Sequence, residues 1–266
     1  MPRDGRGRPR WELAVENNVG SGCRKRKSIF SACGSVSALF PITARHAEGE
    51  HYTPNLIFRM AQYFQLHPVN PQQRLIRQAV EIIRGGGVIA YPTDSSYALG
   101  CHIGDKDAME RILRIRRLDE KHNFTLVCRD LAQAAVYARI GNADFRLLKA
   151  HTPGSYTFLL PATREVPRRL QHAKRKTIGV RVPDHPVVHA LLAELGEPLM
   201  SSTLILPNEE LPLADAHEIR ARLEHELDLV IDAGPCGLEP TTVVLLEDGA
   251  ARVLRPGKGD PAPFQA

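Results

Sequence analysis

From residue 60 onward, the sequence predicts an α/β domain built around one central β-sheet. Segments whose apolar residues recur at helical spacing alternate with short apolar runs, and this alternation is typical of a sheet flanked by helices. Hydrophobic residues make up 43% of the chain and charged residues 24%, which provides a core of useful size for a globular protein. No apolar run approaches the roughly 18 residues that a membrane-spanning helix needs, so no membrane partner is expected.

The strand that we expect at the centre of the sheet lies in the stretch 85–101. Val88–Tyr91 is an apolar run of strand length, and Pro92 ends it because proline has no backbone donor for the ladder. Thr93–Ser96 then follows the carboxyl end of this strand, which is where ligands bind in open α/β sheets. These four residues suit a simple turn equally well, because Thr, Asp and Ser side chains hydrogen-bond to their own backbone.

The neighbouring elements have local signals of their own. Asn70 and Pro71 are a suitable N-cap and first residue for a helix that ends at the glycines 85–87. Asp105 or Asp107 can cap the following helix. The other expected helices are 131–139, 143–150, 183–195 and 214–226, and the other expected strands lie within 124–128, 153–160, 177–182, 198–206, 228–232, 243–246 and 252–254.

Residues 1–59 differ from the rest of the chain. They hold 10 Lys and Arg and 5 Asp and Glu, which accounts for the whole net charge of +5. Their basic residues are scattered among Gly and Ser without a period, which predicts a mostly disordered extension. A basic RNA-binding arm is one alternative. The simpler alternative is that Met60 is the true start and that residues 1–59 are a mis-annotated extension, so that residues 60–266 form the folded domain.

Charge is also unevenly distributed within the folded domain. Residues 111–181 carry 16 basic and 5 acidic side chains, whereas residues 182–266 carry 5 basic and 15 acidic side chains. The basic segment is suited to face a polyanion such as a nucleotide or RNA. The alternative is that its charges pair with the acidic segment.

The cysteines and histidines predict no metal site. The five cysteines are odd in number and lack C-x-x-C spacing, which argues against a zinc ribbon or a disulfide scaffold and favours the reducing cytoplasm. Cys101 and Cys128 stand in apolar surroundings, where we expect unreactive thiols. His185 and His189 have helical i,i+4 spacing, but no acidic residue stands between them as in the zinc motif H-E-x-x-H.

Hydroxyl side chains near expected strand ends and a set of arginines are the remaining chemistry-bearing residues. They are suited to phosphate and small polar groups, and comprise Thr93, Ser95, Ser96, Ser202, Thr203, Thr241, Thr242, Arg114, Arg116, Arg181 and Arg255. Phosphoryl or nucleotidyl transfer needs mainly positioning and charge neutralisation, which such residues provide. Arg181 stands inside an apolar strand, so its burial requires either a carboxylate partner or a ligand.

Six motifs in the same order resemble those of the YrdC-like family, and together they cover about residues 68–258. They are Tyr-Pro-Thr-Asp-Ser-Ser-Tyr-Ala-Leu-Gly (91–100), Pro-Gly-Ser-Tyr-Thr (153–157), Val-Arg-Val-Pro-Asp-His-Pro (180–186), Glu-Pro-Leu-Met-Ser-Ser-Thr (197–203), Asp-Ala-Gly (232–234) and Arg-Pro-Gly (255–257). Three further stretches resemble the YciO subgroup: Asn-Pro-Gln-Gln-Arg-Leu-Ile (70–76), His-Asn-Phe-Thr-Leu (122–126) and Lys-Arg-Lys-Thr-Ile-Gly (174–179).

This resemblance implies a twisted mixed β-sheet flanked by helices, with a concave basic face. It also implies an activity related to threonylcarbamoyl-AMP synthesis, which joins ATP, L-threonine and bicarbonate and serves the tRNA modification t6A. ATP would arrive with Mg²⁺ as a substrate, and no tightly bound cofactor is expected. Binding of double-stranded RNA or tRNA without synthase activity is the alternative that the family offers. Hydrolysis of threonylcarbamoyl-AMP is a further alternative, which the departures from the family pattern described below allow.

The resemblance also assigns roles to residues. Thr93, Asp94 and Ser95 would bind the threonine and carbamate end of the substrate, together with Thr203. The nucleotide and its phosphates would contact Arg116, Thr157, Arg181, Ser202 and Arg255, where Arg116 matches the lysine of the family motif Lys-x-Arg and Arg255 closes the site. Arg114, which belongs to the set of arginines above, is expected to contact the phosphates with them.

Four places depart from the family pattern. The lysine of Lys-x-Arg is Arg116, and the common Lys-Pro-Leu is replaced by Asn-Phe-Thr-Leu at 123–126. The arginine of Lys-x-Arg falls on Leu118, and the asparagine of the motif Thr-Ser-Ala-Asn falls on Ile205. Because loss of one electrostatic donor costs about 100-fold or more in rate, we expect slow or altered chemistry on a preserved fold.

Overall fold

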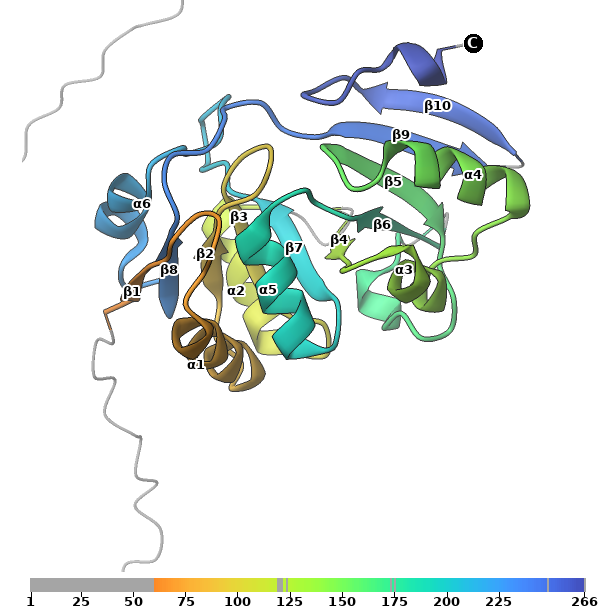
Figure 1. Ribbon diagram of the computed structural model, residues 1–266. Coiled ribbons are helices and arrows are strands. Elements are labelled where there is room, and N and C mark those ends of the chain that lie inside the picture. The colour runs from red at the N-terminus through yellow and green to blue at the C-terminus, as the bar shows by residue number, and fades with distance from the viewer. Residues whose placement is uncertain are drawn as a thin grey trace, which may run out of the picture. The chain divides into compact units, whose positions relative to one another are not determined.

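The structure is a computed structural model (Figure 1). It describes residues 60–118, 122, 124–172, 174, 176–247 and 249–265. All of these belong to one compact unit, Pro54–Ala266. The prediction that residues 1–59 form an extension falls outside the described residues.

A large mixed β-sheet runs through the described domain, as predicted. Its strands are β1 (Gln62–Gln65), β2 (Ile89–Tyr91), β3 (Ala98–His102), β4 (Thr125–Val127), β5 (Tyr156–Pro161), β6 (Thr177–Arg181), β7 (Leu199–Thr203), β8 (Leu229–Asp232), β9 (Thr242–Glu247) and β10 (Ala250–Arg255). Their order is β1-β8-β2-β3-β7-β4-β6-β5-β9-β10. The pairs β1–β8, β2–β8, β4–β6 and β5–β9 are parallel, and the other neighbours are antiparallel.

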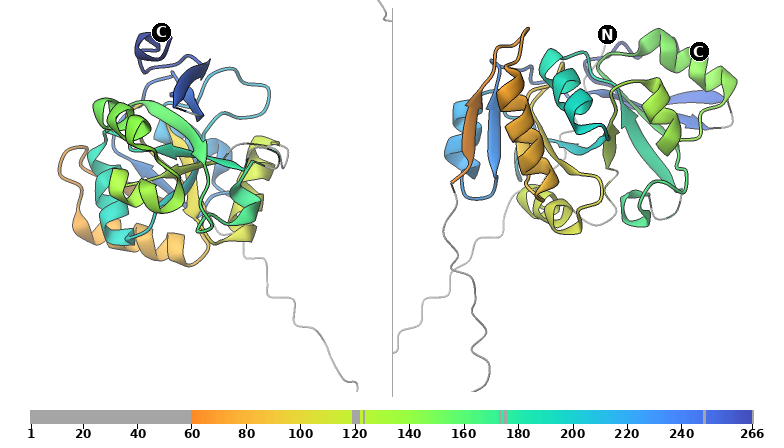
Figure 2. Two further views of the ribbon diagram at one scale, coloured as in Figure 1. Left: turned by 90° about the vertical axis from the view of Figure 1, so that its right-hand side faces the viewer. Right: turned by 60° about the horizontal axis from the view of Figure 1, so that its bottom comes forward.

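Helices cover both faces of this sheet (Figures 1 and 2). They are α1 (Gln73–Arg84), α2 (Lys106–Arg116), α3 (Leu131–Tyr137), α4 (Asn142–His151), α5 (Pro186–Leu195) and α6 (Ala216–Leu223), with short 3₁₀ helices η1 (Arg168–Leu170) and η2 (Ala262–Phe264). α1 and α5 pack on one face and share a hydrophobic cluster, whereas α2, α3, α4 and α6 contribute to the cluster on the opposite face.

Strand β2 separates these two clusters. Ile89 and Tyr91 belong to the cluster of α1 and α5, whereas Val88 and Ala90 belong to the other. Successive side chains of a strand point to opposite faces, so β2 is buried on both sides. This double burial explains why residues 88–91 form a continuous apolar run.

Several boundaries differ from the sequence-based expectation. α1 begins at Gln73 with Gln72 as its N-cap, two residues later than expected, because Asn70 is held in a preceding turn where its backbone N–H donates to His67 Nδ1 at 3.0 Å. Asp105 rather than Asp107 caps α2, accepting from Ala108 N at 2.8 Å. α6 likewise starts at Ala216, not Ala214, because the Asp215 side chain accepts from the backbone N–H of Glu218.

Strands β1 and β3 were not predicted. β3 contains Ala98 and Gly100, which favour strands weakly, and it forms because its backbone pairs with β2 on one side and β7 on the other. β1 depends in the same way on pairing with β8, more than 160 residues further along the chain. Within the described part of the chain, no helix is both long enough and apolar enough to span a membrane.

Candidate functional site

The loop between β2 and β3 has the hydrogen bonding of a turn. Thr93 Oγ1 accepts from the backbone N–H groups of Ser95 and Ser96, both at 3.2 Å, and donates to the carbonyl of Ser96 at 2.6 Å. Thr93, Ser95 and Ser96 are all buried, with 3% exposure or less. The two interpretations of 93–96 therefore do not exclude each other, because a well-ordered turn also presents a rigid surface.

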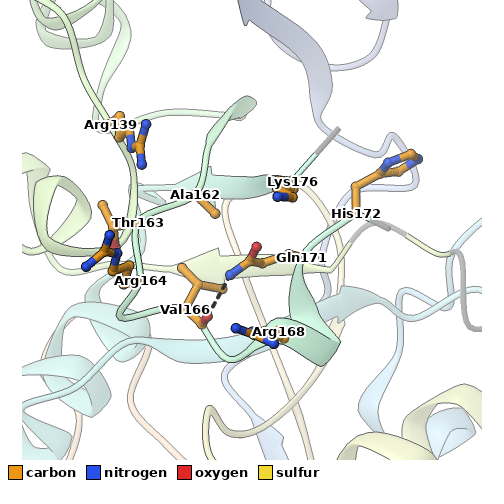
Figure 3. A pocket seen from close by; sticks show the side chains of 9 residues that line it. All are labelled: Arg139, Ala162, Thr163, Arg164, Val166, Arg168, Gln171, His172 and Lys176. Carbon is orange, nitrogen blue, oxygen red and sulfur yellow. Dashed lines mark hydrogen bonds between the residues drawn. The ribbon is translucent and has the colours of Figure 1, made fainter. Parts of the chain in front are cut away.

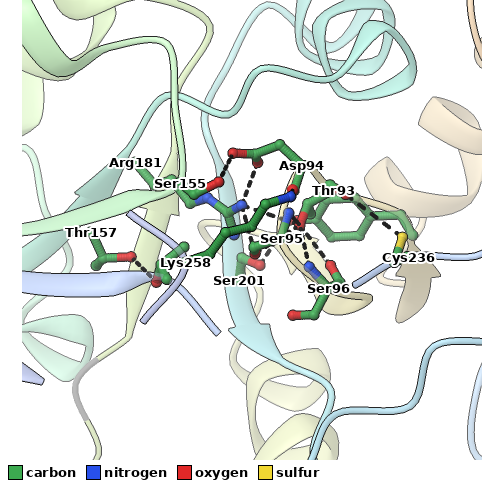
Figure 4. Close-up of polar contacts among 12 residues, drawn as sticks. Thr93, Asp94, Ser95, Ser96, Ser155, Thr157, Arg181, Ser201, Cys236 and Lys258 are labelled. Carbon is green, nitrogen blue, oxygen red and sulfur yellow. Dashed lines mark hydrogen bonds and ion pairs between the residues drawn. The ribbon is translucent and has the colours of Figure 1, made fainter. Parts of the chain in front are cut away.

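Arg181 holds this loop from the carboxyl end of β6 (Figure 4). Its Nη2 donates to Thr93 Oγ1 at 3.1 Å and Ser95 Oγ at 3.0 Å, and it forms an ion pair with Asp94 Oδ1. Arg181 is only 7% exposed. The sequence indicated that a buried Arg181 needs either a carboxylate or a ligand as its partner. The structure provides the carboxylate of Asp94. The Nε of Arg181 is buried and finds no hydrogen-bond partner among the described residues.

Three further residues contact the loop. Ser155 Oγ donates to Asp94 Oδ2 at 2.7 Å, so both carboxylate oxygens of Asp94 are engaged. Lys258 Nζ donates to the backbone carbonyl of Asp94, and Cys236 Sγ donates to that of Thr93 at 3.6 Å. Sequence reasoning did not assign these three to the site. Ser155 lies inside the motif 153–157, and Lys258 directly follows the motif 255–257. Their nearness to these motifs is the feature of the sequence that could have indicated a place in the site.

A cavity of about 280 Å³ opens next to the loop. It is lined by Arg116, His122, Thr125, Thr157, Leu159, Ser201, Ser202, Thr203, Ile205, Thr241, Val243, Leu254 and Arg255. A second, smaller pocket of about 20 Å³ shares six of these residues and also includes Arg181. The shared hydroxyl residues therefore connect the cavity with the cluster around Asp94.

Hydroxyl groups form the floor of this cavity. Thr157 Oγ1 and Thr241 Oγ1 lie 2.8 Å apart, although they come from distant parts of the chain. Ser201 Oγ donates to the carbonyl of Leu99 at 3.0 Å and accepts from Tyr91 Oη at 2.7 Å. Hydroxyls both donate and accept, so such a floor suits a ligand with mixed polar groups.

Two guanidinium groups line the other side of the cavity. Arg116 donates to Ser202 Oγ at 2.6 Å and to the carbonyl of Ile205 at 3.2 Å, and Arg255 donates to the carbonyl of Thr241 at 3.1 Å. Neither arginine forms an ion pair with a described residue. Burial, with the positive charge of Arg255 as the second cause, lowers the pKa of Arg116 to about 10. Arg116 still carries its charge at neutral pH, so this wall of the cavity attracts anions.

The structure brings nine of the ten predicted site residues together. Thr93, Asp94, Ser95 and Arg181 form the loop cluster, while Arg116, Thr157, Ser202, Thr203 and Arg255 line the cavity. Arg114 is exposed and lines a separate surface depression with Arg111, Arg117 and Arg222. Residues two apart on a helix lie about 200° apart around its axis, so Arg114 and Arg116 cannot face the same site.

The departures at Ile205 and Leu118 occupy different places. Ile205 lines the cavity, where its apolar side chain offers no hydrogen bond. Leu118 does not line it, and its backbone N–H donates to the carbonyl of Leu113 at 2.9 Å. Among the described residues, no group of three or more His, Cys, Asp and Glu is arranged to hold a metal ion. Burial raises the pKa of the Cys101 and Cys128 thiols to about 12, in keeping with unreactive core cysteines.

The described domain is thus an α/β protein with a large mixed sheet and a hydroxyl-lined cavity that carries two arginines. The family model described as telomere recombination, Sua5/YciO/YrdC, matches residues 81–257. The chain belongs to this family. YciO of Escherichia coli strain K12 is 58% identical over 205 residues, which covers 77% of this chain and all of YciO. The crystal structure of Escherichia coli YciO superimposes with a TM-score of 0.75, with the same coverage.

More distant relatives connect the chain to synthases. The threonylcarbamoyl-AMP synthase of Nitrosococcus oceani is 41% identical over 129 residues, which covers 48% of this chain and 69% of the synthase. Sua5 of P. abyssi, solved in complex with L-threonine, superimposes with a TM-score of 0.67 at 26% identity and covers 73% of this chain and 57% of Sua5. The domain is thus related to threonylcarbamoyl-AMP synthases at low identity.

Proposed function

We propose that the cavity binds ATP and L-threonine and that the protein makes or breaks threonylcarbamoyl-AMP there. Synthesis would join ATP, L-threonine and bicarbonate with release of diphosphate. The observation that carries this proposal is the pair Arg116 and Arg255, two cations without a described carboxylate partner, beside a floor of hydroxyls. The relationship to the Nitrosococcus oceani synthase and to the L-threonine complex of Sua5 supports the choice of substrates.

The arrangement suits adenylyl transfer because that chemistry depends on positioning and charge neutralisation. Arg116 and Arg255 would hold phosphate oxygens, with Mg²⁺ delivered by ATP. Thr157 and Ser202 would contact the nucleotide, and Thr203 would contact threonine and its carbamate. Thr93 and Ser95 would act through the shape of the loop, because their hydroxyls already hydrogen-bond to Arg181.

Asp94 and Arg181 take a different role in this proposal from the one that the family resemblance implies. Both carboxylate oxygens of Asp94 are engaged, by Arg181 and Ser155. Asp94 therefore positions the loop and does not bind Mg²⁺ or substrate through its carboxylate. The charge of Arg181 is neutralised by the ion pair with Asp94. Arg116 and Arg255 are therefore the residues that would bind the phosphates.

The direct test incubates the full chain with MgATP, L-threonine and bicarbonate and measures diphosphate and threonylcarbamoyl-AMP. Because Ile205 replaces a family amide, we expect synthesis about 100-fold or more below that of a synthase assayed in parallel. A second reaction supplied with threonylcarbamoyl-AMP measures its breakdown. If neither reaction turns over and MgATP causes no shift in melting temperature, the proposal is wrong.

RNA binding is a second candidate function, and one observation favours it. A depression of about 650 Å³ is lined by Arg139, Arg164, Arg168, His172, Lys176 and the neutral residues Ala162, Thr163, Val166 and Gln171 (Figure 3). None of its arginines and lysines forms an ion pair with a described residue. The basic segment 111–181 pairs with the acidic segment through Arg111 and Asp228, at 2.8 Å, but this depression keeps its positive charge.

Salt dependence separates RNA binding from nucleotide binding. Double-stranded RNA that contacts this depression should bind with an affinity that falls steeply with salt, because contacts to phosphates release counterions. The double variant Arg164→Gln/Lys176→Gln should reduce that slope by about one to two and leave ATP binding unchanged. An unchanged slope would rule this depression out as the RNA surface.

A further inference from the structure

The chain after β10 folds back over the site as a strap, which we define as residues 256–264. The backbone N–H of Gly257 donates to Thr242 Oγ1 at 2.9 Å, and that of Lys258 donates to the carbonyl of Pro240 at 2.9 Å. Thr242 Oγ1 in turn donates to the carbonyl of Gly259. Thr242 is fully buried, so one internal hydroxyl fixes the strap on both sides of Lys258.

Close packing also fixes this path. A Cβ atom at Gly257 would lie 2.3 Å from the carbonyl oxygen of Pro240, and one at Gly259 would lie 2.4 Å from the ring of Tyr156. At these distances only glycine fits. The far end of the strap is anchored by Phe264, which is 3% exposed and packs against the rings of His151 and Tyr156, with centroids 4.8 Å and 5.5 Å away.

The strap places the side chain of Lys258 next to the loop 93–96. Its ammonium group donates to the backbone carbonyl of Asp94, which is neutral. The nearby Asp94 carboxylate does not neutralise Lys258, because it is paired with Arg181 and bonded by Ser155. Lys258 is exposed and forms no ion pair with a described residue. The strap therefore holds an uncompensated positive charge against the loop 93–96.

We propose that Lys258 is a substrate-binding residue that holds the carboxylate of the amino-acid substrate. This inference rests on the proposed function, which binds L-threonine in the cavity. The smaller pocket that adjoins this cavity reaches Arg181, which hydrogen-bonds to the loop 93–96. Of the cations that hydrogen-bond to the loop in the described chain, Arg181 is committed to Asp94 and Lys258 is not. Arg116 and Arg255 stand on the nucleotide wall of the cavity. The ammonium group of Lys258 would therefore form a charged hydrogen bond with the substrate carboxylate.

Calorimetric titration with L-threonine and with L-threoninamide, which lacks the carboxylate charge, tests this assignment in the presence of MgATP. Wild type should bind L-threonine about 10- to 100-fold more tightly than the amide, the range expected for one charged hydrogen bond. Lys258→Met should bind both alike, with the affinity for the amide unchanged. Lys258→Arg should restore much of the preference, and Lys106→Met, which removes an exposed lysine from α2, should behave as wild type.

The outcomes separate the two proposals. If Lys258→Met still prefers L-threonine to the amide as strongly as wild type, the role of Lys258 is wrong and the proposed function stands. If wild type binds MgATP but neither amino-acid ligand, L-threonine is not the substrate, and both this inference and the proposed reaction are wrong. Unchanged melting temperatures of the variants would show that any loss of preference is not caused by unfolding.

Discussion

Arg181 and Asp94 form a buried ion pair that ties the carboxyl end of β6 to the loop that follows β2. Their side chains are 8% and 10% exposed. The two residues are far apart in sequence, and the pair is the central contact of the site.

Breaking this pair should destabilise the domain strongly. Removal of one partner leaves an uncompensated buried charge, which costs about 3–5 kcal/mol. We expect losses of this size in the free energy of unfolding for Asp94→Asn and for Arg181→Met, measured by urea denaturation. The double variant Asp94→Asn/Arg181→Met should lose less than the two single changes combined, because it leaves no unpaired charge.

The exposed pair Arg129–Asp130 provides the matched control. Its side chains are 51% and 43% exposed, so Arg129→Met should cost less than about 1 kcal/mol. A loss for Asp94→Asn as small as that of Arg129→Met would contradict the structural role of the buried pair.

Arg116 and Arg114 should differ sharply in their effect on ATP binding. Arg116 lines the cavity and Arg114 does not, although both belong to α2. Arg116→Met removes a charged hydrogen-bond donor and should weaken MgATP binding about 10- to 100-fold. Arg114→Met should leave it within about two-fold of wild type. Equal effects of the two variants in a calorimetric titration would exclude this cavity as the phosphate site.

Restoring the amide at position 205 should raise the rate of synthesis. Ile205 lines the cavity, and an asparagine there would supply a hydrogen-bond donor to the developing charge, worth about 100-fold or more in rate. Ile205→Asn should therefore accelerate diphosphate release, while Ile205→Ala, which changes size without adding a donor, should not. Leu118→Arg should have the smaller effect, because Leu118 does not line the cavity. A larger increase in the rate of synthesis from Leu118→Arg than from Ile205→Asn would contradict this prediction.

His185 should make stability depend on pH. Burial lowers its pKa, opposed by the negative charge of Asp94, and its Nδ1 finds no hydrogen-bond partner among the described residues. The folded state thus binds the proton less tightly than the unfolded state, whose histidine pKa is about 6.5. The contribution of neutral His185 to the free energy of unfolding is fully present above about pH 6.5. It is lost progressively as the pH falls below this value.

The variant His185→Gln isolates this contribution. Between pH 7.5 and pH 5 it should lose less free energy of unfolding than wild type, by at most about 1.4 kcal/mol for each pH unit below 6.5. His67→Gln is the control, because His67 is exposed. If the free energy of unfolding depends on pH in the same way for wild type and His185→Gln, the pH dependence does not come from His185.

Much of this protein is determined by its sequence. Helix caps and apolar spacing act locally, so Asp105 and the glycines 85–87 mark element ends without reference to the rest of the chain. The six ordered motifs indicated the family, which the family model confirms over residues 81–257. They also contain the loop 93–96 and five residues that line the cavity, Thr157, Ser201, Ser202, Thr203 and Arg255. The helical period alone would have separated Arg116 from Arg114, since Arg116 lies one turn from the buried Ile112.

Only the tertiary structure decided how these residues are connected. The sequence showed that Arg181 needs a partner, but Asp94 was one of many acidic residues that could have met it. β3 and β1 exist because distant strands pair with them, and the roles of Ser155 and Lys258 appear only when the strap and β5 meet the loop after β2. Local propensity acts over a few residues, whereas ion pairs and strand pairing depend on distances that only the folded chain defines.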